Sequence, residues 1–253
     1  MGVVNNANLN IVRVDTSGDV AARALEVFIE HANEAIDSRG RFMVAISGGR
    51  TPEGFFRLLG ESQKASAVPW DKVQLFWVDE RCVAPDSDAS NYGLAVNTFL
   101  NKTPIPETNV HRMFGESCDY GTAVEDYETT IRRAFDLKAG QVPQFDLIYL
   151  GMGADGHVGS LFPNSYVVFD TNDLVSPVYF MGEKCDRMTL THPVLCAAKH
   201  LVILVSGCRK AEVARLVLQG APDEVKYPVH TLWPVLDKVM WIIDNEAAKH
   251  LDR

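Results

Sequence analysis

The chain has 253 residues, of which 47% are hydrophobic and 23% are charged, and this composition excludes a disordered or fibrous protein. It carries 24 Lys and Arg against 33 Asp and Glu, which gives a net charge of -9. Because binding to nucleic acids and to anionic membranes depends on positive charge, we expect neither as a partner, and an anionic ligand has to meet a local group of cations.

Short apolar, β-branched runs alternate with longer amphipathic segments along the chain. The runs are typical of buried strands, and the amphipathic segments are typical of helices that pack one face on a sheet. In chain order, they predict a helix over 19–37, a strand over 41–47, a helix that begins at Thr51, a strand over 73–79, a helix over 122–138, strands over 145–151 and 200–207, a helix over 208–219 and a strand over 239–244. Ser17 or Asp19 is the expected cap of the first helix, while Thr51 caps the second and Pro52 lies in its first turn.

Strands that alternate with helices indicate an α/β protein with a doubly wound, mostly parallel Rossmann-like sheet and helices on both faces. No repeat, low-complexity tract or linker interrupts the pattern, so we expect a single α/β domain over 1–253, as a monomer or a small homo-oligomer. Residues 164–190 show neither period clearly and are expected to form a loop or a small extra β element near the site.

The five cysteines are scattered and form no Cys-x-x-Cys pair, as is typical of reduced thiols inside cells. The first ten residues lack the basic start and apolar run of a signal peptide, and no apolar stretch reaches the ~20 residues that cross a bilayer. The histidines show no His-x-x-x-His spacing of the kind found in zinc sites. We therefore expect a cytoplasmic protein with no membrane segment, no metal and no cofactor.

Ligands of an open parallel sheet bind beyond the carboxyl ends of its strands. Four predicted strands end in polar or glycine-rich segments, which are SGGRT at 47–51, DER at 79–81, GMGADGH at 151–157 and SGCRK at 206–210. In a parallel sheet these four segments emerge at one edge, so we expect them to form one site.

The first segment, Ser47-Gly48-Gly49-Arg50-Thr51, joins a strand to a helix N-terminus, and its glycines allow backbone N–H groups to face a ligand. This arrangement suits a phosphate group, although an ordinary tight turn capped by Thr51 is an equal alternative on the local sequence. Because the pattern Gly-x-x-x-x-Gly-Lys-Ser/Thr is absent, a nucleoside triphosphate is disfavoured.

Residues 151–156 match Gly-x-Gly-x-x-Gly after a strand, a pattern found in dinucleotide-binding loops. Such a loop has to open a long helix, yet Pro163 follows Gly156 within seven residues, so we interpret the glycines as a means to present Asp155 and His157. A histidine accepts a proton near neutral pH, and His157 is therefore the candidate general base. The alternative is a capping or core histidine.

Asp79-Glu80-Arg81 places two carboxylates and a cation at one strand end. Asp79 is a candidate to orient the histidine or a substrate hydroxyl, and Arg81 to hold an anion or a developing oxyanion, with a surface group of ion pairs as the alternative. Arg187 and Lys210 are single cations whose usual position is in solvent. No Gly-x-Ser-x-Gly motif occurs, which disfavours a serine hydrolase.

Five ordered segments together carry a family resemblance: SGGRTP, DER followed by Pro85, Asp88 and Ser90-Asn91, GMGADGHVGSLFP, RMTLTHPVL, and SGCRK. They resemble the 6-phosphogluconolactonases, within the wider glucosamine/galactosamine-6-phosphate isomerase family that includes glucosamine-6-phosphate deaminases. The resemblance covers nearly the whole chain. It implies hydrolysis of a sugar-phosphate lactone, 6-phospho-D-glucono-1,5-lactone, in the oxidative pentose phosphate pathway.

The resemblance also implies roles for individual residues. His157 would be the base that takes a proton from the attacking water, and Asp155 or Asp79 would orient the imidazole or the substrate. Arg81 or backbone N–H groups would stabilise the oxyanion, without a metal. The implied phosphate pocket comprises Gly48, Gly49 and Thr51, with Arg81, Arg187 and Lys210 as candidate cationic partners.

Two positions favour a lactonase over a deaminase. In the deaminases the Asp-Gly-His turn precedes a pattern similar to Phe-Asn-Glu-Pro, whose glutamate assists the histidine, whereas this chain has Ser160-Leu161-Phe162-Pro163. The deaminases also carry Asp-Glu-Tyr where this chain has Asp79-Glu80-Arg81. The alternatives are a glucosamine-6-phosphate deaminase/isomerase and a non-catalytic sugar-phosphate sensor.

Overall fold

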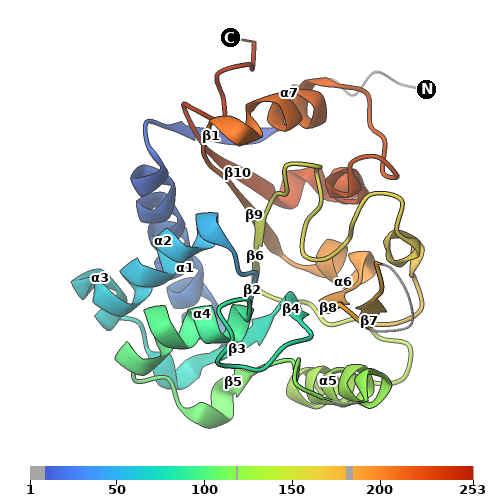
Figure 1. Cartoon of the computed structure of the whole chain (residues 1–253). Helices are drawn as coiled ribbons and strands as arrows, with labels where there is room; N and C mark the ends of the chain where they lie inside the picture. The colour runs from blue at the N-terminus through green and yellow to red at the C-terminus, as the bar shows by residue number, and fades with distance from the viewer. Residues whose placement is uncertain (1–8, 118, 181–184, 253) are drawn as a thin grey trace.

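The computed structural model describes residues 9–117, 119–180 and 185–252. Its central sheet has seven parallel strands in the order β1 (Asn10–Val14), β10 (Val239–Asp244), β9 (His200–Val205), β6 (Leu147–Gly151), β2 (Phe42–Ile46), β3 (Val73–Trp77) and β5 (Val110–His111). A second sheet has three antiparallel strands in the order β4 (Asp79–Arg81), β8 (Arg187–Leu190) and β7 (Val175–Val178). The predicted fold class, a mostly parallel α/β sheet with a small extra β element, is confirmed (Figure 1).

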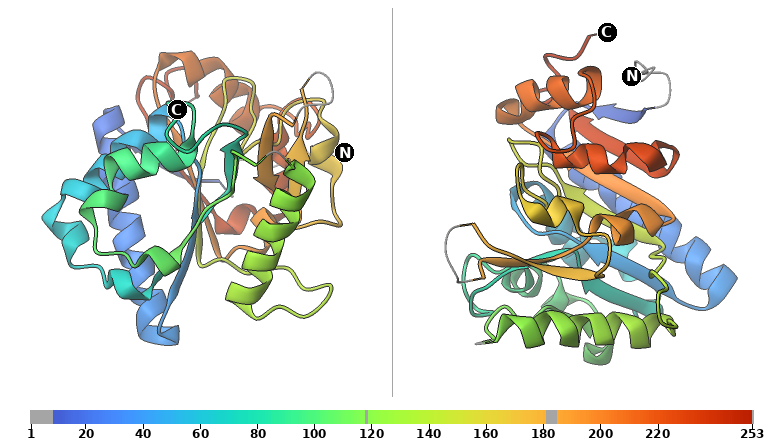
Figure 2. Two further views of the ribbon diagram at one scale, coloured as in Figure 1. Left: turned by 60° about the horizontal axis from the view of Figure 1, so that its bottom comes forward. Right: turned by 90° about the vertical axis from the view of Figure 1, so that its right-hand side faces the viewer.

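Helices cover both faces of the central sheet (Figures 1 and 2). One face carries α1 (Ser17–Arg39), α2 (Arg50–Glu61), α3 (Gln63–Ser66) and α4 (Asn91–Thr98). The other face carries α5 (Tyr120–Phe135), α6 (His192–Ala197) and the second sheet. The remaining helix is α7 (Ala211–Gln219), and the 3₁₀ segments are η2 (Trp70–Lys72), η3 (Leu100–Lys102), η4 (Glu107–Asn109), η5 (Tyr166–Phe169), η6 (Cys208–Lys210) and η7 (Pro228–Lys238).

The central strands are buried because helices cover them on both sides. All five residues of β2 are buried, and so are the five residues of β9 that follow His200. A strand covered on both faces needs apolar side chains at every position, which is why these strands are continuous apolar runs in the sequence. The burial leaves only the strand ends free to carry polar chemistry.

The predicted cap of the first helix is wrong by one residue. Thr16 caps α1, since its hydroxyl accepts a hydrogen bond from the N–H of Asp19 at 3.2 Å. The Asp19 carboxylate in turn accepts from the N–H of Thr16 at 3.0 Å, which completes a capping box. Ser17 is the first residue of the helix, and Asp19 is the partner of the cap.

The predicted cap of the second helix is also wrong. Gly49, with a φ of 110°, precedes the first helical residue, Arg50, so Thr51 lies inside the first turn together with Pro52. The Thr51 hydroxyl lies 3.1 Å from the hydroxyl of Ser206. This hydrogen bond joins the first turn of α2 to the loop after β9, and so connects two of the segments predicted to meet.

The predicted strand over 73–79 divides between the two sheets at Val78. Its N–H donates to the carbonyl of Ile46 at 2.9 Å in the central sheet, and its carbonyl accepts from the N–H of Leu190 at 2.7 Å in the second sheet. Asp79 therefore begins β4 instead of ending β3. The predicted strand over 200–207 similarly stops at Val205.

Several sequence predictions concern segments that lie partly outside the residues described by the structure. Residues 164–190 hold η5, β7 and β8, with 181–184 outside the described residues. Residues 1–8, on which the expected lack of a signal peptide mostly rests, and Cys118 are also outside them, while the other four cysteines are free thiols. No helix within the described ranges combines the length and apolarity that a membrane crossing requires.

Candidate active site

The loops at the carboxyl ends of β2, β6 and β9 meet the second sheet around a cavity of about 310 Å³. The lining residues are Ser47, Gly48, Gly49, Arg50, Thr51, Pro52, Asp79, Arg81, Gly151, Met152, Gly153, Ala154, His157, Gly159, Arg187 and Lys210. Every predicted site residue except Asp155 therefore borders one cavity, and Asp155 contacts His157. The sequence segments that meet here are up to 163 positions apart, from Ser47 to Lys210.

His157 is held by the carboxylate of Asp155. The distance from His157 Nδ1 to Asp155 Oδ1 is 2.6 Å, and the same oxygen accepts from the backbone N–H of His157 at 3.3 Å. Burial raises the pKa of Asp155, but the hydrogen bond and charge of His157 outweigh it and lower that pKa overall. An ionised carboxylate at Nδ1 favours the tautomer of a neutral imidazole that carries its proton there, which leaves the lone pair on Nε2.

Glycine at position 153 makes room for this pair. A Cβ atom on Gly153 would lie 2.1 Å from His157 Nδ1 and 2.4 Å from Asp155 Oδ1, closer than atoms approach. The loop is closed by hydrogen bonds from the N–H of Gly153 to the carbonyl of His157 at 2.8 Å and from the N–H of Gly156 to the carbonyl of Gly153 at 3.2 Å. No helix follows this loop before η5, in a stretch that the structure describes throughout, so the dinucleotide-binding pattern lacks the helix that it requires.

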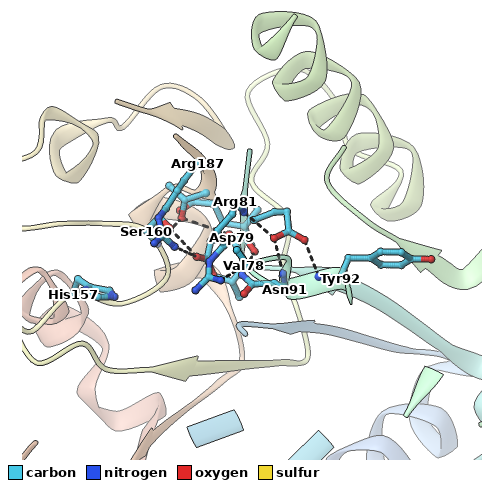
Figure 3. Close-up of polar contacts among 12 residues, drawn as sticks. Val78, Asp79, Arg81, Asn91, Tyr92, His157, Ser160 and Arg187 are labelled. Carbon is cyan, nitrogen blue, oxygen red and sulfur yellow. Dashed lines mark hydrogen bonds and ion pairs between the residues drawn. The ribbon is translucent and has the colours of Figure 1, made fainter. Parts of the chain in front are cut away.

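Asp79 has different partners from Asp155. It is 4% exposed, and its Oδ2 accepts a hydrogen bond from the hydroxyl of Ser160 at 2.7 Å and lies 3.9 Å from a terminal nitrogen of Arg187 (Figure 3). Of the two candidates for orienting the imidazole, Asp155 makes the contact. Asp79 instead lies beside Arg187, and its hydrogen bond to Ser160, 81 positions later in the chain, was not predictable from local sequence patterns.

Glu80 organises the chain around Asp79 and Arg81. It is 2% exposed, and its carboxylate accepts from the N–H groups of Arg81, Asn91 and Tyr92 at 2.8, 2.7 and 2.7 Å (Figure 3). Asn91 begins α4, so the carboxylate also lies at a helix N-terminus. Burial raises the pKa of Glu80, and the three backbone N–H groups oppose part of that rise. The two adjacent carboxylates of the DER segment therefore differ in role, with Glu80 holding the loop and Asp79 facing the cavity.

Arg81 and Arg187 face each other as paired residues of β4 and β8. A terminal nitrogen of Arg81 donates to the carbonyl of Ala89, which holds the side chain along the loop. Burial lowers the pKa of Arg187, and the positive charge of Arg81 adds to this effect. Asp79, Glu80 and Asp186 oppose this effect, and Asp79 lines the cavity together with the two arginines.

Arg50 and Lys210 supply the other positive wall. Burial lowers the pKa of Lys210, partly offset by Asp155, while Arg50 and Arg209 lower it further. Arg50 lies at the N-terminus of α2, whose unpaired N–H groups favour an anion. Gly48 permits the loop to pass Asn91, because a Cβ atom there would lie 2.0 Å from Asn91 Oδ1.

The cavity thus combines a histidine–aspartate pair with four cations. Such an arrangement can bind an anionic group and remove a proton from water nearby. Among the described residues, no group of three or more His, Cys, Asp or Glu side chains is placed to hold a metal ion.

The chain is similar to known proteins over most of its length. The model of the family described as glucosamine-6-phosphate isomerases/6-phosphogluconolactonase matches residues 15–241. A 6-phosphogluconolactonase of Synechocystis sp. is 33% identical over 229 residues, which cover 90% of this chain and 92% of that protein.

Two solved structures are also similar. One is 6-phosphogluconolactonase from Thermotoga maritima, with 28% identity and a TM-score of 0.77 over 93% of this chain and 99% of the other. The other is 6-phosphogluconolactonase from Trypanosoma brucei, with 25% identity and a TM-score of 0.83 over 96% and 99%.

Proposed function

This chain belongs to the glucosamine-6-phosphate isomerase/6-phosphogluconolactonase family, and we propose that it hydrolyses 6-phospho-D-glucono-1,5-lactone to 6-phospho-D-gluconate. The observation that carries the proposal is that the His157–Asp155 pair opens onto the same cavity as Arg50, Arg81 and Arg187. A lactone with a phosphate needs both features, a base for the water and cations for the phosphate. The proteins named 6-phosphogluconolactonase among its relatives support the same substrate.

In the proposed reaction, neutral His157 takes a proton at Nε2 from a water molecule as that water attacks C1 of the lactone. Asp155 holds the imidazole and stabilises its charged form. The C1–O bond of the ring then breaks, the ring oxygen takes the proton from His157 and becomes the hydroxyl group on C5, and the new carboxylic acid releases its proton to solvent. A base of this kind contributes about 10²–10⁴-fold, which is adequate for an activated ester held in place without a metal.

The cations have two further roles, which are to stabilise the oxyanion and to bind the phosphate. Arg81 stabilises the negative charge that grows on the carbonyl oxygen, together with nearby backbone N–H groups. The phosphate is held by Ser47, Gly48, Gly49, Arg50 and Thr51 at the start of α2, with Arg187 and Lys210. Charge-assisted hydrogen bonds contribute about 1.5–3 kcal/mol each, so the phosphate provides most of the affinity.

Two alternatives have less support. A glucosamine-6-phosphate deaminase has a glutamate that assists the histidine, within a pattern similar to Phe-Asn-Glu-Pro. In this chain Phe162 occupies the position of that glutamate. Asp79 is the one acidic residue among the described residues that line the cavity, and Ser160 and Arg187 already engage it. A non-catalytic sensor needs the cations but has no use for a carboxylate-oriented histidine.

The test is a coupled assay that follows 6-phosphogluconate through its dehydrogenase, with spontaneous hydrolysis subtracted. We expect His157→Ala to lower kcat by about 10²–10⁴-fold, and the exposed His250→Ala control to leave it unchanged. Wild-type turnover in His157→Ala would remove that residue from the role of base. The proposed activity would be overturned if the wild-type protein did not accelerate hydrolysis of the lactone above its spontaneous rate but released ammonia from glucosamine 6-phosphate.

A further inference from the structure

Phe162 contacts both of the opposing groups of the site. Its ring centroid lies 4.4 Å from that of the His157 imidazole, with an angle of 44° between the planes. The guanidinium carbon of Arg187 lies 5.3 Å from the same centroid. Phe180 packs edge-on against the ring at 4.8 Å. One aromatic side chain therefore bridges the candidate base and a candidate phosphate ligand.

The chain places Phe162 there by reversing direction after His157. Gly159 has a φ of 54°, and the N–H of Leu161 donates to the carbonyl of Val158 at 3.0 Å. Within this turn the buried hydroxyl of Ser160 is tied to Asp79. The turn is thus anchored to the opposite wall, and Phe162 follows it directly.

Neither polar group is held firmly by its carboxylate alone. The side chains of His157 and Asp155 are 28% and 49% exposed, and ion pairs open to water contribute little rigidity. Arg187 lies 3.9 Å from Asp79, which is beyond hydrogen-bond distance. Packing against Phe162 gives the imidazole a second constraint. Arg187 lies over Phe162 at 5.3 Å and over Phe180, which packs on Phe162, at 5.8 Å.

We propose that Phe162 is a positioning residue that fixes the His157 imidazole and the Arg187 guanidinium relative to each other across the cavity. This inference rests on the proposed function, because it assigns to Phe162 the geometry that the lactone requires. An uncharged ring also leaves the charge of Arg187 available to the substrate, whereas a carboxylate at this position would neutralise it. A flexible aliphatic side chain would preserve the apolar character and lose the constraint.

The experiment compares Phe162→Leu with Phe162→Tyr and with Phe169→Leu. Phe169 is 60% exposed on η5, so Phe169→Leu makes the same chemical change at the surface. We expect Phe162→Leu to lower kcat about 10-fold to 100-fold and to raise KM, because misplaced groups cost up to that factor. Phe162→Tyr, which keeps the ring, should restore most of kcat, and Phe169→Leu should match the wild type.

A spectroscopic readout separates positioning from loss of folding. The nuclear Overhauser contact between the imidazole Hε1 of His157, identified by its loss in His157→Ala, and the α-protons of Gly153 should weaken in Phe162→Leu and persist in Phe169→Leu, at unchanged thermal unfolding temperature. Wild-type kcat and an unchanged contact between His157 and Gly153 in Phe162→Leu would overturn the inference. If Phe162→Leu unfolds, a Phe162→Tyr protein that folds but is as slow as His157→Ala would overturn it as well.

The two proposals fail in different ways. A wild-type protein without lactonase activity contradicts the proposed function, whatever the Phe162 variants do. An active wild type whose activity depends on His157 but is indifferent to Phe162→Leu contradicts only the positioning role.

Discussion

Single residues shape the site for steric or electrostatic reasons, and Gly153 is the clearest example. Its missing side chain is what allows His157 and Asp155 to lie at 2.6 Å from each other. Because the pKa of Asp155 is lowered, its ionised form is favoured in the folded protein and contributes to the free energy of unfolding. This contribution to stability is lost as the pH falls through the lowered pKa. The sequence predicted both members of the pair and interpreted the loop glycines as a means to present them, but the steric conflict that Gly153 avoids is visible only in the structure.

We expect Gly153→Ala to lower kcat/KM by about 10-fold to 100-fold, since the new methyl group has to displace the imidazole or the carboxylate. Gly18→Ala is the matched control, because its Cβ would meet Thr16 Oγ1 at an ordinary 3.5 Å. The measurement is steady-state kinetics on all three proteins, with thermal unfolding alongside. An unchanged kcat/KM in Gly153→Ala would contradict the steric argument.

At the scale of elements, the sequence predicted what is buried and missed what is short or at an edge. The runs over 41–47, 145–151 and 239–244 are apolar because both faces are covered, and each contains a strand of the central sheet. The strand Asn10–Val14 lies at the sheet edge with mostly exposed side chains, so it has no comparable run. Val110–His111 is too short to show a period.

The connection between β4 and α4 shows a second limit of the sequence. The role of Glu80 depends on donors eleven and twelve positions later, and that of Ser160 on an aspartate 81 positions earlier. Local periodicity carries no information about such pairings, because they arise only when loops from different strands meet. The meeting of the loops at one edge was nevertheless predictable, since it follows from the parallel sheet.

We expect Glu80→Gln to lower the free energy of unfolding by about 1–3 kcal/mol, because an amide nitrogen would face backbone donors that the carboxylate now satisfies. For a chain of this size that loss corresponds to ~2–4 °C in Tm per kcal/mol. The exposed Glu246→Gln is the control, and urea and thermal unfolding are the measurements. Equal stability of Glu80→Gln and wild type would show that the carboxylate does not hold the loop.

At the scale of the whole molecule, a net charge of -9 coexists with four cations around one cavity. An anionic substrate is therefore repelled by most of the surface and attracted at one place, which favours correct entry over contact elsewhere. Salt reduces the attraction because mobile ions screen charges over about 10 Å at 0.1 M.

The KM for the phospholactone should accordingly rise about threefold or more between about 0.05 M and about 0.5 M salt, with kcat unchanged. The same lactone without its phosphate is the control, and its KM should not depend on salt. Parallel initial-rate measurements at both ionic strengths decide the matter. A KM that does not change for the phosphorylated substrate would mean that charge does not govern its binding.

The N–H of Val78 bonds to Ile46 in the large sheet and its carbonyl bonds to Leu190 in the small sheet, so one residue joins the two sheets. A rotation of one sheet against the other would have to break these bonds. Arg81 and Arg187, paired on the small sheet, are thereby placed by the main chain relative to the loop that follows β2. We therefore expect this wall of the cavity to keep its place when a sugar phosphate enters.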